Sequence, residues 1–158
     1  MKSPIKRHES LKHLSRDHHH GLLLCWKIRE GLKKGIEPER IRAYTRFFYS
    51  SHLVPHFTFE ENEVFTSLKK DHPLIKQALA EHENLSALFL NEKNHISILK
   101  DIEKDLEAHI RFEERILFKE IQQNCTEEVL ALMDKKENDL ITPNPDDWED
   151  KFWLKNVV

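Results

Sequence analysis

The sequence predicts an all-α fold, an up-down-up-down four-helix bundle with a short C-terminal extension. Apolar residues recur at helical rather than alternating spacing through most of the 158 residues. Only three glycines and six prolines interrupt the chain, which is too few for a turn-rich all-β fold. Long helical segments joined by short connections are typical of such a bundle.

The first two helices are defined by their ends. One helix is predicted over about 10–34. Residues 31–35 (GLKKG) mark its C-terminal end, because basic side chains favour the last turn of a helix and glycine commonly follows it. Pro38 then restarts a helix, since proline is tolerated in the first turn. This second helix should reach about residue 70, with a kink or break at Pro55.

The third and fourth helices are predicted by the same reasoning. Asp71 is the expected N-cap of a helix that has Pro73 in its first turn and reaches about residue 91. The fourth is predicted over about 95–123, with an apolar stripe that continues to Ile116.

The remaining chain is expected to belong to the same domain. Residues 1–125 would form the bundle, and 126–158 a C-terminal helix and an aromatic tail that packs on it. Thr126 would cap the short helix, and the charge-rich stretch 127–139 reads as a solvated helix face.

Composition excludes several functional classes. The longest apolar run covers only residues 22–26, so no membrane span is expected, and the N-terminus lacks the apolar stretch of a secretory signal. Acidic and basic residues are interspersed at a net charge of −3, which argues against a nucleic-acid partner. Two cysteines cannot form a disulfide framework and suit a reducing cytoplasm. The unusual feature of the composition is its histidine content, eleven residues in the chain.

Part of this histidine content lies in an internal repeat. Residues 53–65 (LVPHFTFEENEVF) and 106–118 (LEAHIRFEERILF) share the pattern His-x-x-Phe-Glu-Glu-x-x-x-Phe. Each copy places a histidine four residues before a glutamate, namely His56 before Glu60 and His109 before Glu113. On a helix this spacing puts both side chains on one face.

Both pairs continue the apolar stripes of their helices, so they should point into the core. An ionised carboxylate buried without a partner is prohibitively costly, and a metal cation removes that cost. Imidazole nitrogen and carboxylate oxygen are ligands for iron, manganese or zinc.

The other two helices add a histidine each, His18 and His82, both on apolar stripes and both preceded by an acid. Four histidines and two glutamates at one level fit two metals, each bound by two imidazoles and bridged by Glu60 and Glu113. An octahedral ion would keep positions for an oxo or hydroxo bridge and for an exogenous molecule, unlike a closed zinc site.

Alternatives remain at several positions. His20 could replace His18, and His52, one turn before His56, could be a ligand or a partner of one. Glu61 and Glu114 would contact ligands or form surface ion pairs. Cys25 reads as a small core residue, with a redox role as the alternative.

At these residues the sequence resembles the hemerythrin-like, or HHE cation-binding, family of di-iron four-helix bundles, over about residues 10–122. The resemblance implies that members bind dioxygen reversibly, sense oxygen or iron, or act in nitric-oxide and oxidative-stress responses and iron–sulfur repair. It also implies the ligand set His18, His56, Glu60, His82, His109 and Glu113.

The chain departs from the family's invertebrate oxygen carriers, whose third helix carries a histidine pair four residues apart. Here the partner of His82 would be Ala78 or Ser86, which favours a more open and reactive site. In those carriers the last acid comes five residues after its histidine, which would select Glu114, whereas the internal repeat favours Glu113.

We therefore predict a metal-binding protein with a non-haem di-iron centre that binds or senses dioxygen, nitric oxide or peroxide, or iron itself. Manganese and zinc would accept the same ligands. The alternatives are a stress-response protein that assists iron–sulfur repair or removes peroxide or nitric oxide, and a non-redox zinc-binding or interaction bundle. The sequence indicates no oligomeric state.

Overall fold

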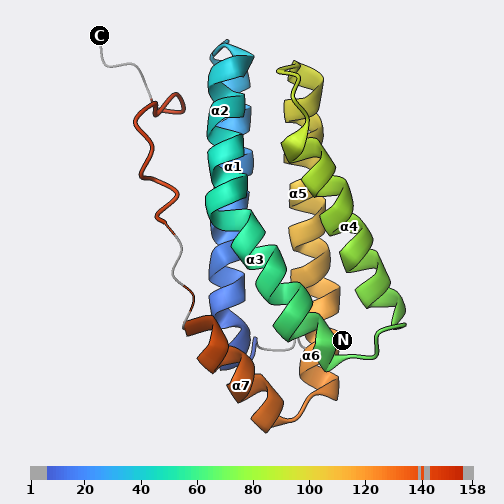
Figure 1. The fold of residues 1–158 in the computed structure, drawn as a ribbon. Helices are drawn as coiled ribbons and strands as arrows, with labels where there is room; N and C mark the ends of the chain where they lie inside the picture. Colours follow the sequence, from blue (N-terminus) through green and yellow to red (C-terminus); the bar gives the residue numbers. More distant parts are fainter. Residues whose placement is uncertain (1–6, 139, 141–142, 155–158) are drawn as a thin grey trace, which may run out of the picture.

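The computed structural model describes residues 7–138, 140 and 143–154 and is helical throughout its regular elements. Four long helical segments lie side by side, and a further helix crosses one end of them (Figure 1). This arrangement confirms the predicted four-helix bundle with a C-terminal extension. Residues 1–6 and 155–158, at the ends of the two predicted ranges, lie outside the described residues.

The segments are arranged in chain order, and several contain more than one kind of helical turn. The first comprises η1 (Glu9–Leu11) and α1 (Lys12–Lys33). The second comprises α2 (Pro38–Phe48), η2 (Tyr49–Leu53), α3 (Val54–Phe59), η3 (Glu60–Val64) and η4 (Phe65–Ser67). The third is α4 (Pro73–Leu90), and the fourth comprises α5 (Ile96–Phe112), η5 (Glu113–Leu117) and α6 (Phe118–Asn124). The crossing helix is α7 (Glu127–Asn138).

Three of these short elements, η2, η3 and η5, are π-helical turns. A π turn accommodates an extra residue and shifts the inward face of the next helical turn. The predicted apolar stripe of the fourth segment does not continue to Ile116, which lies in η5 and is 50% exposed, while its neighbour Leu117 is fully buried. Pro55 lies just after η2, and the second segment changes direction there without ending, as Figure 1 shows.

The helix N-caps are partly as predicted. The third segment is capped by His72, not Asp71, because the Leu74 amide donates to His72 Nδ1 at 3.1 Å. Thr126 caps α7, accepting a hydrogen bond from the Val129 amide at 3.2 Å.

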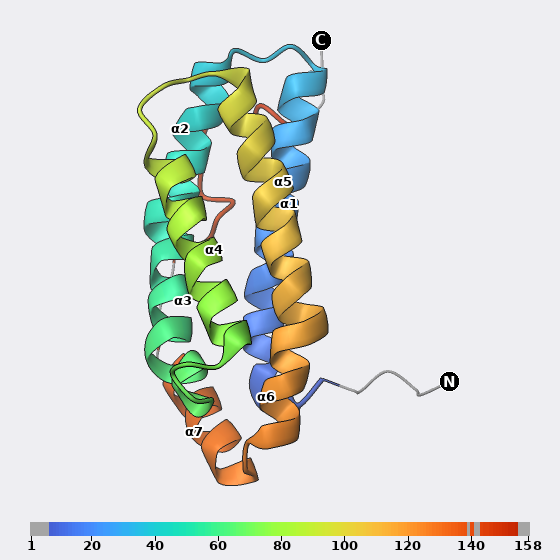
Figure 2. The same cartoon turned by 90° about the vertical axis from the view of Figure 1, so that its right-hand side faces the viewer.

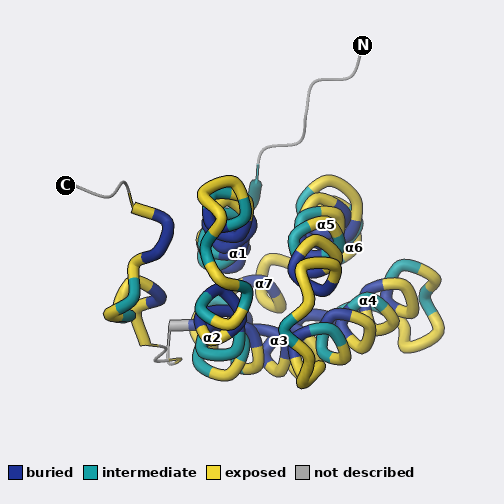
Figure 3. Tube along the Cα trace, turned by 90° about the horizontal axis from the view of Figure 1, so that it is seen from above, coloured by how far each residue is buried: buried dark blue, intermediate teal, exposed yellow. Residues whose placement is uncertain are grey.

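The apolar core consists of two clusters, and buried residues line the inner faces of all four segments (Figure 3). The first cluster lies toward the α1–α2 connection and includes Leu24, Ile28 and Leu85. The second lies toward α7 and includes Leu14, Val64 and Phe118. Each segment carries polar side chains at the level between the two clusters, and these side chains form the candidate site.

The C-terminal tail returns along the bundle beside α1 and α2 (Figure 1). Phe152 and Trp153 are buried in the first core cluster, where both rings contact Tyr44. Gly31 allows this approach, since a Cβ atom there would lie 2.9 Å from the Phe152 ring. Lys27 is buried beneath the tail and donates to the Tyr44 hydroxyl and to Asp146, each at 2.9 Å. In the described part of the chain, no helix is long and apolar enough to cross a membrane.

Candidate metal centre

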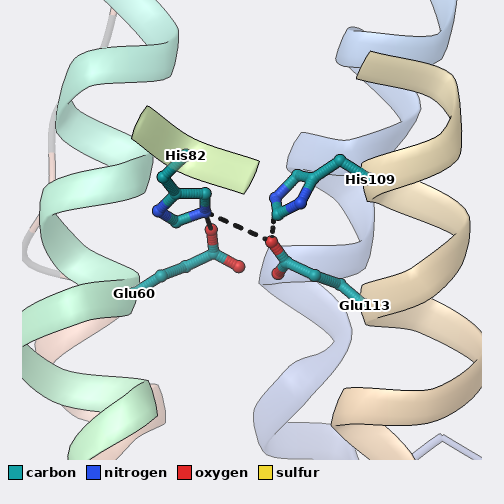
Figure 4. Close-up of side chains that lie close together, drawn as sticks. All are labelled: Glu60, His82, His109 and Glu113. Atoms are coloured by element: carbon teal, nitrogen blue, oxygen red, sulfur yellow. Dashed lines mark hydrogen bonds and ion pairs between the residues drawn. The ribbon is translucent and has the colours of Figure 1, made fainter. Parts of the chain in front are cut away.

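Six buried polar residues meet at the level between the two core clusters. Each is at most 4% exposed, and both glutamates are fully buried. Every segment contributes at least one of them, and four are seen converging in Figure 4. The six are the residues singled out from the sequence, namely His18, His56, Glu60, His82, His109 and Glu113.

These residues form two overlapping groups whose potential ligand atoms lie within 4.8 Å of one another. One group contains Glu60, His82, His109 and Glu113, and the other contains His18, His56 and Glu60. Glu60 belongs to both groups. Glu113 also reaches across, since its Oε2 lies 3.6 Å from His18 Nε2. The geometry is therefore that of two adjacent cation positions that share carboxylates.

Local helix geometry produces this convergence. His56 lies in the last turn of α3 and Glu60 is the first residue of η3, while His109 lies in the last turn of α5 and Glu113 is the first residue of η5. Within each pair the side chains meet: His56 Nε2 lies 3.2 Å from Glu60 Oε1, and His109 Nε2 contacts Glu113 Oε1 (Figure 4). Both copies of the sequence repeat thus deliver a carboxylate at the start of a π turn, a feature that often marks functional sites.

The inward atoms lack conventional hydrogen-bond partners among the described residues. Those without one are His18 Nε2, His56 Nε2, His109 Nε2, both oxygens of Glu60, and Glu113 Oε2. Buried polar atoms are normally paired, so such a concentration requires an explanation. Imidazole nitrogens and carboxylate oxygens aimed at one another suit transition-metal cations, and the residues present therefore fit a binuclear metal site.

The outer nitrogen of each histidine faces a carboxylate from a neighbouring segment. The four pairs are Asp17–His56 at 3.1 Å, Glu114–His18 at 2.8 Å, Glu81–His109 at 2.8 Å and Glu61–His82 at 3.8 Å. Together they close a ring around the bundle, since the carboxylate of each segment contacts the histidine of another. The three shorter contacts are hydrogen bonds, which fix the ring orientation and keep the proton on Nδ1, so that Nε2 is left for a metal. His82 Nδ1 lies at ion-pair distance from Glu61 and has no hydrogen-bond partner among the described residues.

A family model described as the hemerythrin HHE cation binding domain matches residues 9–121. The chain belongs to this family. The match covers the first three segments, the fourth as far as Ile121 in α6, and all six clustered residues, and it ends before α7. No curated protein and no solved structure matches the chain.

Charge in this HHE domain stabilises protonated histidines when no metal is bound. Burial alone would lower their pKa, but the carboxylates outweigh it and raise the pKa of His82 to about 11 and of His109 to about 9. The pKa of His56 is likewise well above its usual value, chiefly because of Glu60 acting against burial. Burial opposes ionisation of Glu113, yet His109 holds its pKa well below the usual value.

The alternative residues lie outside the two groups. His52 is buried beside Phe48, and burial lowers its pKa to about 4. His20 is half-buried, with its ring 5.5 Å from that of His52. Cys25 is a buried core residue whose thiol donates to the Glu103 carbonyl at 3.4 Å, and burial raises its pKa to about 12.

The sequence predicted some of the carboxylates that contact the outer nitrogens of the histidines. Glu61 and Glu114 stand beside the repeated glutamates, and Asp17 and Glu81 each precede a clustered histidine, so their positions were a usable signal. It was wrong about Glu137, which was placed on a solvated helix face. This residue of α7 is 8% exposed.

Proposed function

We propose that this HHE domain binds two iron ions as a non-haem di-iron centre, where it binds dioxygen or a small relative such as nitric oxide or peroxide. His18 and His56 would hold one ion and His82 and His109 the other, with Glu60 and Glu113 bridging. The observation that carries this proposal is that Glu60 belongs to both ligand groups. A bound pair of ferrous ions supplies electrons to a ligand of this kind.

The donor set favours iron over a structural zinc ion. Two imidazoles and two shared carboxylates give four protein ligands to each ion, whereas octahedral iron takes six. The remaining positions are available to an exogenous molecule. Manganese accepts the same donors, so metal analysis must distinguish the two.

The surrounding side chains limit water and orient the ligands. The Phe57 ring stacks on His82 with centroids 3.9 Å apart, and the Phe118 ring stacks on His18 at 5.4 Å. A surface groove of about 460 Å³ between α3 and α4 has His82 and Ser86 in its lining. We place the access route for small ligands here, on the side where the carriers of this family have another histidine.

The proposed setting is the cytoplasm, and the proposed role is binding or sensing rather than catalysis. Both cysteines are free thiols, which suits a reducing compartment. Binding leads to saturation at one ligand per site, whereas an enzyme would consume peroxide or nitric oxide repeatedly in the presence of an electron donor.

The test is the absorption spectrum of the reduced, iron-loaded protein before and after addition of dioxygen, nitric oxide or peroxide. We expect a new charge-transfer band that saturates with the ligand and is absent from Glu60→Ala. The exposed Glu92→Ala variant should behave as the wild type. An unchanged spectrum with all three ligands would contradict the proposal, and sustained turnover would favour the enzymatic alternative.

A further inference from the structure

The start of the described chain lies beside α6 (Figure 2) and is joined to the fourth segment by hydrogen bonds. Arg7, which precedes the family match, has a side chain that is 23% exposed and donates from Nη1 to the Gln122 side-chain oxygen at 3.0 Å. Its second nitrogen, Nη2, donates to Glu114 Oε2 at 2.9 Å and also to the backbone carbonyl oxygen of Glu114. The His8 amide donates to the same Gln122 oxygen at 3.1 Å. Arg7 therefore connects this part of the chain to one of the carboxylates around the metal centre.

Two of the groups that Arg7 contacts lie directly against His18. Glu114 Oε1 pairs with His18 Nδ1 at 2.8 Å. Glu114 Oε2, on the other side of the same carboxylate, accepts from Arg7 and, at 3.0 Å, from the Ser15 hydroxyl. The guanidinium carbon of Arg7 also lies 5.3 Å from the centre of the Phe118 ring, a cation–π distance, and that ring stacks on His18 at 5.4 Å. Arg7 thus acts on the edge of the imidazole through Glu114 and on its face through Phe118.

The contact with Arg7 distinguishes Glu114 from the other carboxylates that face an outer histidine nitrogen. Glu81 is held by a neutral donor, the Gln77 amide, at 2.8 Å. In the described part of the chain, Glu114 is the one carboxylate of these four that a lysine or arginine contacts. A hydrogen bond between two charged groups is stronger than one from a neutral donor, so Arg7 restrains Glu114 more firmly than Gln77 restrains Glu81.

We propose that Arg7 is a positioning residue of the metal centre, which holds Glu114 and Phe118 against the His18 ring. The chain before η1 thereby becomes part of the site. The alternative is that Arg7 only fastens this part of the chain to α6, for which its contact with Gln122 would suffice. The contacts with Glu114 and Phe118 do not depend on a metal, whereas the effect of Arg7 on a bound ion rests on the proposed function.

The first test uses the metal-free, full-length chain and nitrogen-15 NMR of its histidine rings at constant pH. We expect Arg7→Ala to shift the His18 Nδ1–H signal and to speed its exchange with water roughly three- to tenfold, because Glu114 loses a hydrogen bond from a charged group. Gln122→Ala removes the contact with α6 but leaves that with Glu114, and should keep the wild-type signal. Arg16→Ala, which removes an exposed arginine from α1, is the control for the change of charge.

The second test measures iron release to a chelator. Arg7→Ala should release one of two ions roughly three- to tenfold faster, which is less than the roughly 10- to 100-fold effect of losing a direct partner of a metal ligand. The other ion should leave at the wild-type rate, and Gln122→Ala and Arg16→Ala should release both ions as the wild type does. Circular dichroism establishes that each variant is folded.

The proposal is overturned if Arg7→Ala leaves the His18 signal unchanged or if Gln122→Ala shifts it equally, since fastening of the chain alone would then explain Arg7. Equally faster release of both ions from Arg7→Ala would also overturn it, because the contacts of Arg7 lead to His18 and to no other clustered histidine. A wild-type chain that binds no iron would instead contradict the proposed function, and the NMR comparison would still decide the role of Arg7.

Discussion

Protons and metal ions compete for the same histidine nitrogens in this site. Without metal, Glu113 and Glu60 raise the pKa of His109 to about 9 and that of His82 to about 11 against the effect of burial. Both rings are therefore protonated at neutral pH, and each must lose a proton before its inward nitrogen can bind a metal.

Metal binding at pH 7.5 is accordingly expected to release protons, and metal affinity should rise as the pH is raised toward 9. Calorimetric titration in two buffers of different ionisation enthalpy measures this release, because the apparent binding enthalpy then depends on the buffer. Equal enthalpies in the two buffers would contradict the charge state inferred for His82 and His109.

The outer carboxylates should influence metal retention without touching the ion. Glu81→Ala removes the partner of His109 Nδ1, and we expect metal affinity to fall roughly 10- to 100-fold. Glu83→Ala, an exposed change two residues further along α4, is the matched control. Equal affinities for the two variants, measured by competition with a chelator, would show that Glu81 is not needed.

At the scale of single elements, the main error in predicting the inward face of the fourth segment lies in a π turn. A period of 3.6 residues allows either Ile116 or Leu117 to share the face of Glu113, and within η5 Leu117 is the buried one of the two. The sequence contains no turn residue or proline at this point that would mark the π turn. Both side chains of each repeated His/Glu pair are buried as expected, because the histidine lies in the α-helix before the π turn and the glutamate is the first residue of that turn.

Which of these two residues faces the core can be tested by truncating each side chain. Leu117→Ala is expected to lower the free energy of unfolding by about 2–5 kcal/mol, the usual cost for a buried leucine. Ile116→Ala, at a half-exposed position, should change it by no more than about 0.5 kcal/mol. Urea denaturation of the metal-free variants measures both values, and the opposite order would place Ile116 in the core.

At the scale of the whole molecule, the tail and the metal centre are separate features of the fold. Phe152 and Trp153 pack in the first core cluster around Tyr44, whereas the second cluster and α7 lie on the other side of the site. Ending the chain after residue 142 should therefore lower the melting temperature by several degrees because it uncovers Tyr44. The same truncation should leave metal content unchanged, and loss of metal would show that the tail supports the site.

The sequence predicted the bundle and the six clustered residues because both depend on the spacing of residues along a helix. The internal repeat strengthened the prediction for four of the six, His56, Glu60, His109 and Glu113, since the same pattern occurs twice. The sequence could not predict the direction of α7, which depends on the turn after Asn124, and therefore missed Glu137. It also missed the pairing of Asp17 with His56, because a contact between segments depends on how they pack. The family match covers residues 9–121 and does not include α7.

The most direct test of the di-iron assignment is elemental analysis of the protein expressed with added iron and purified without chelator. Two iron ions per chain are expected, because Glu60 and Glu113 join two adjacent pairs of histidines. Stoichiometric zinc, or no stoichiometric metal, would contradict the assignment.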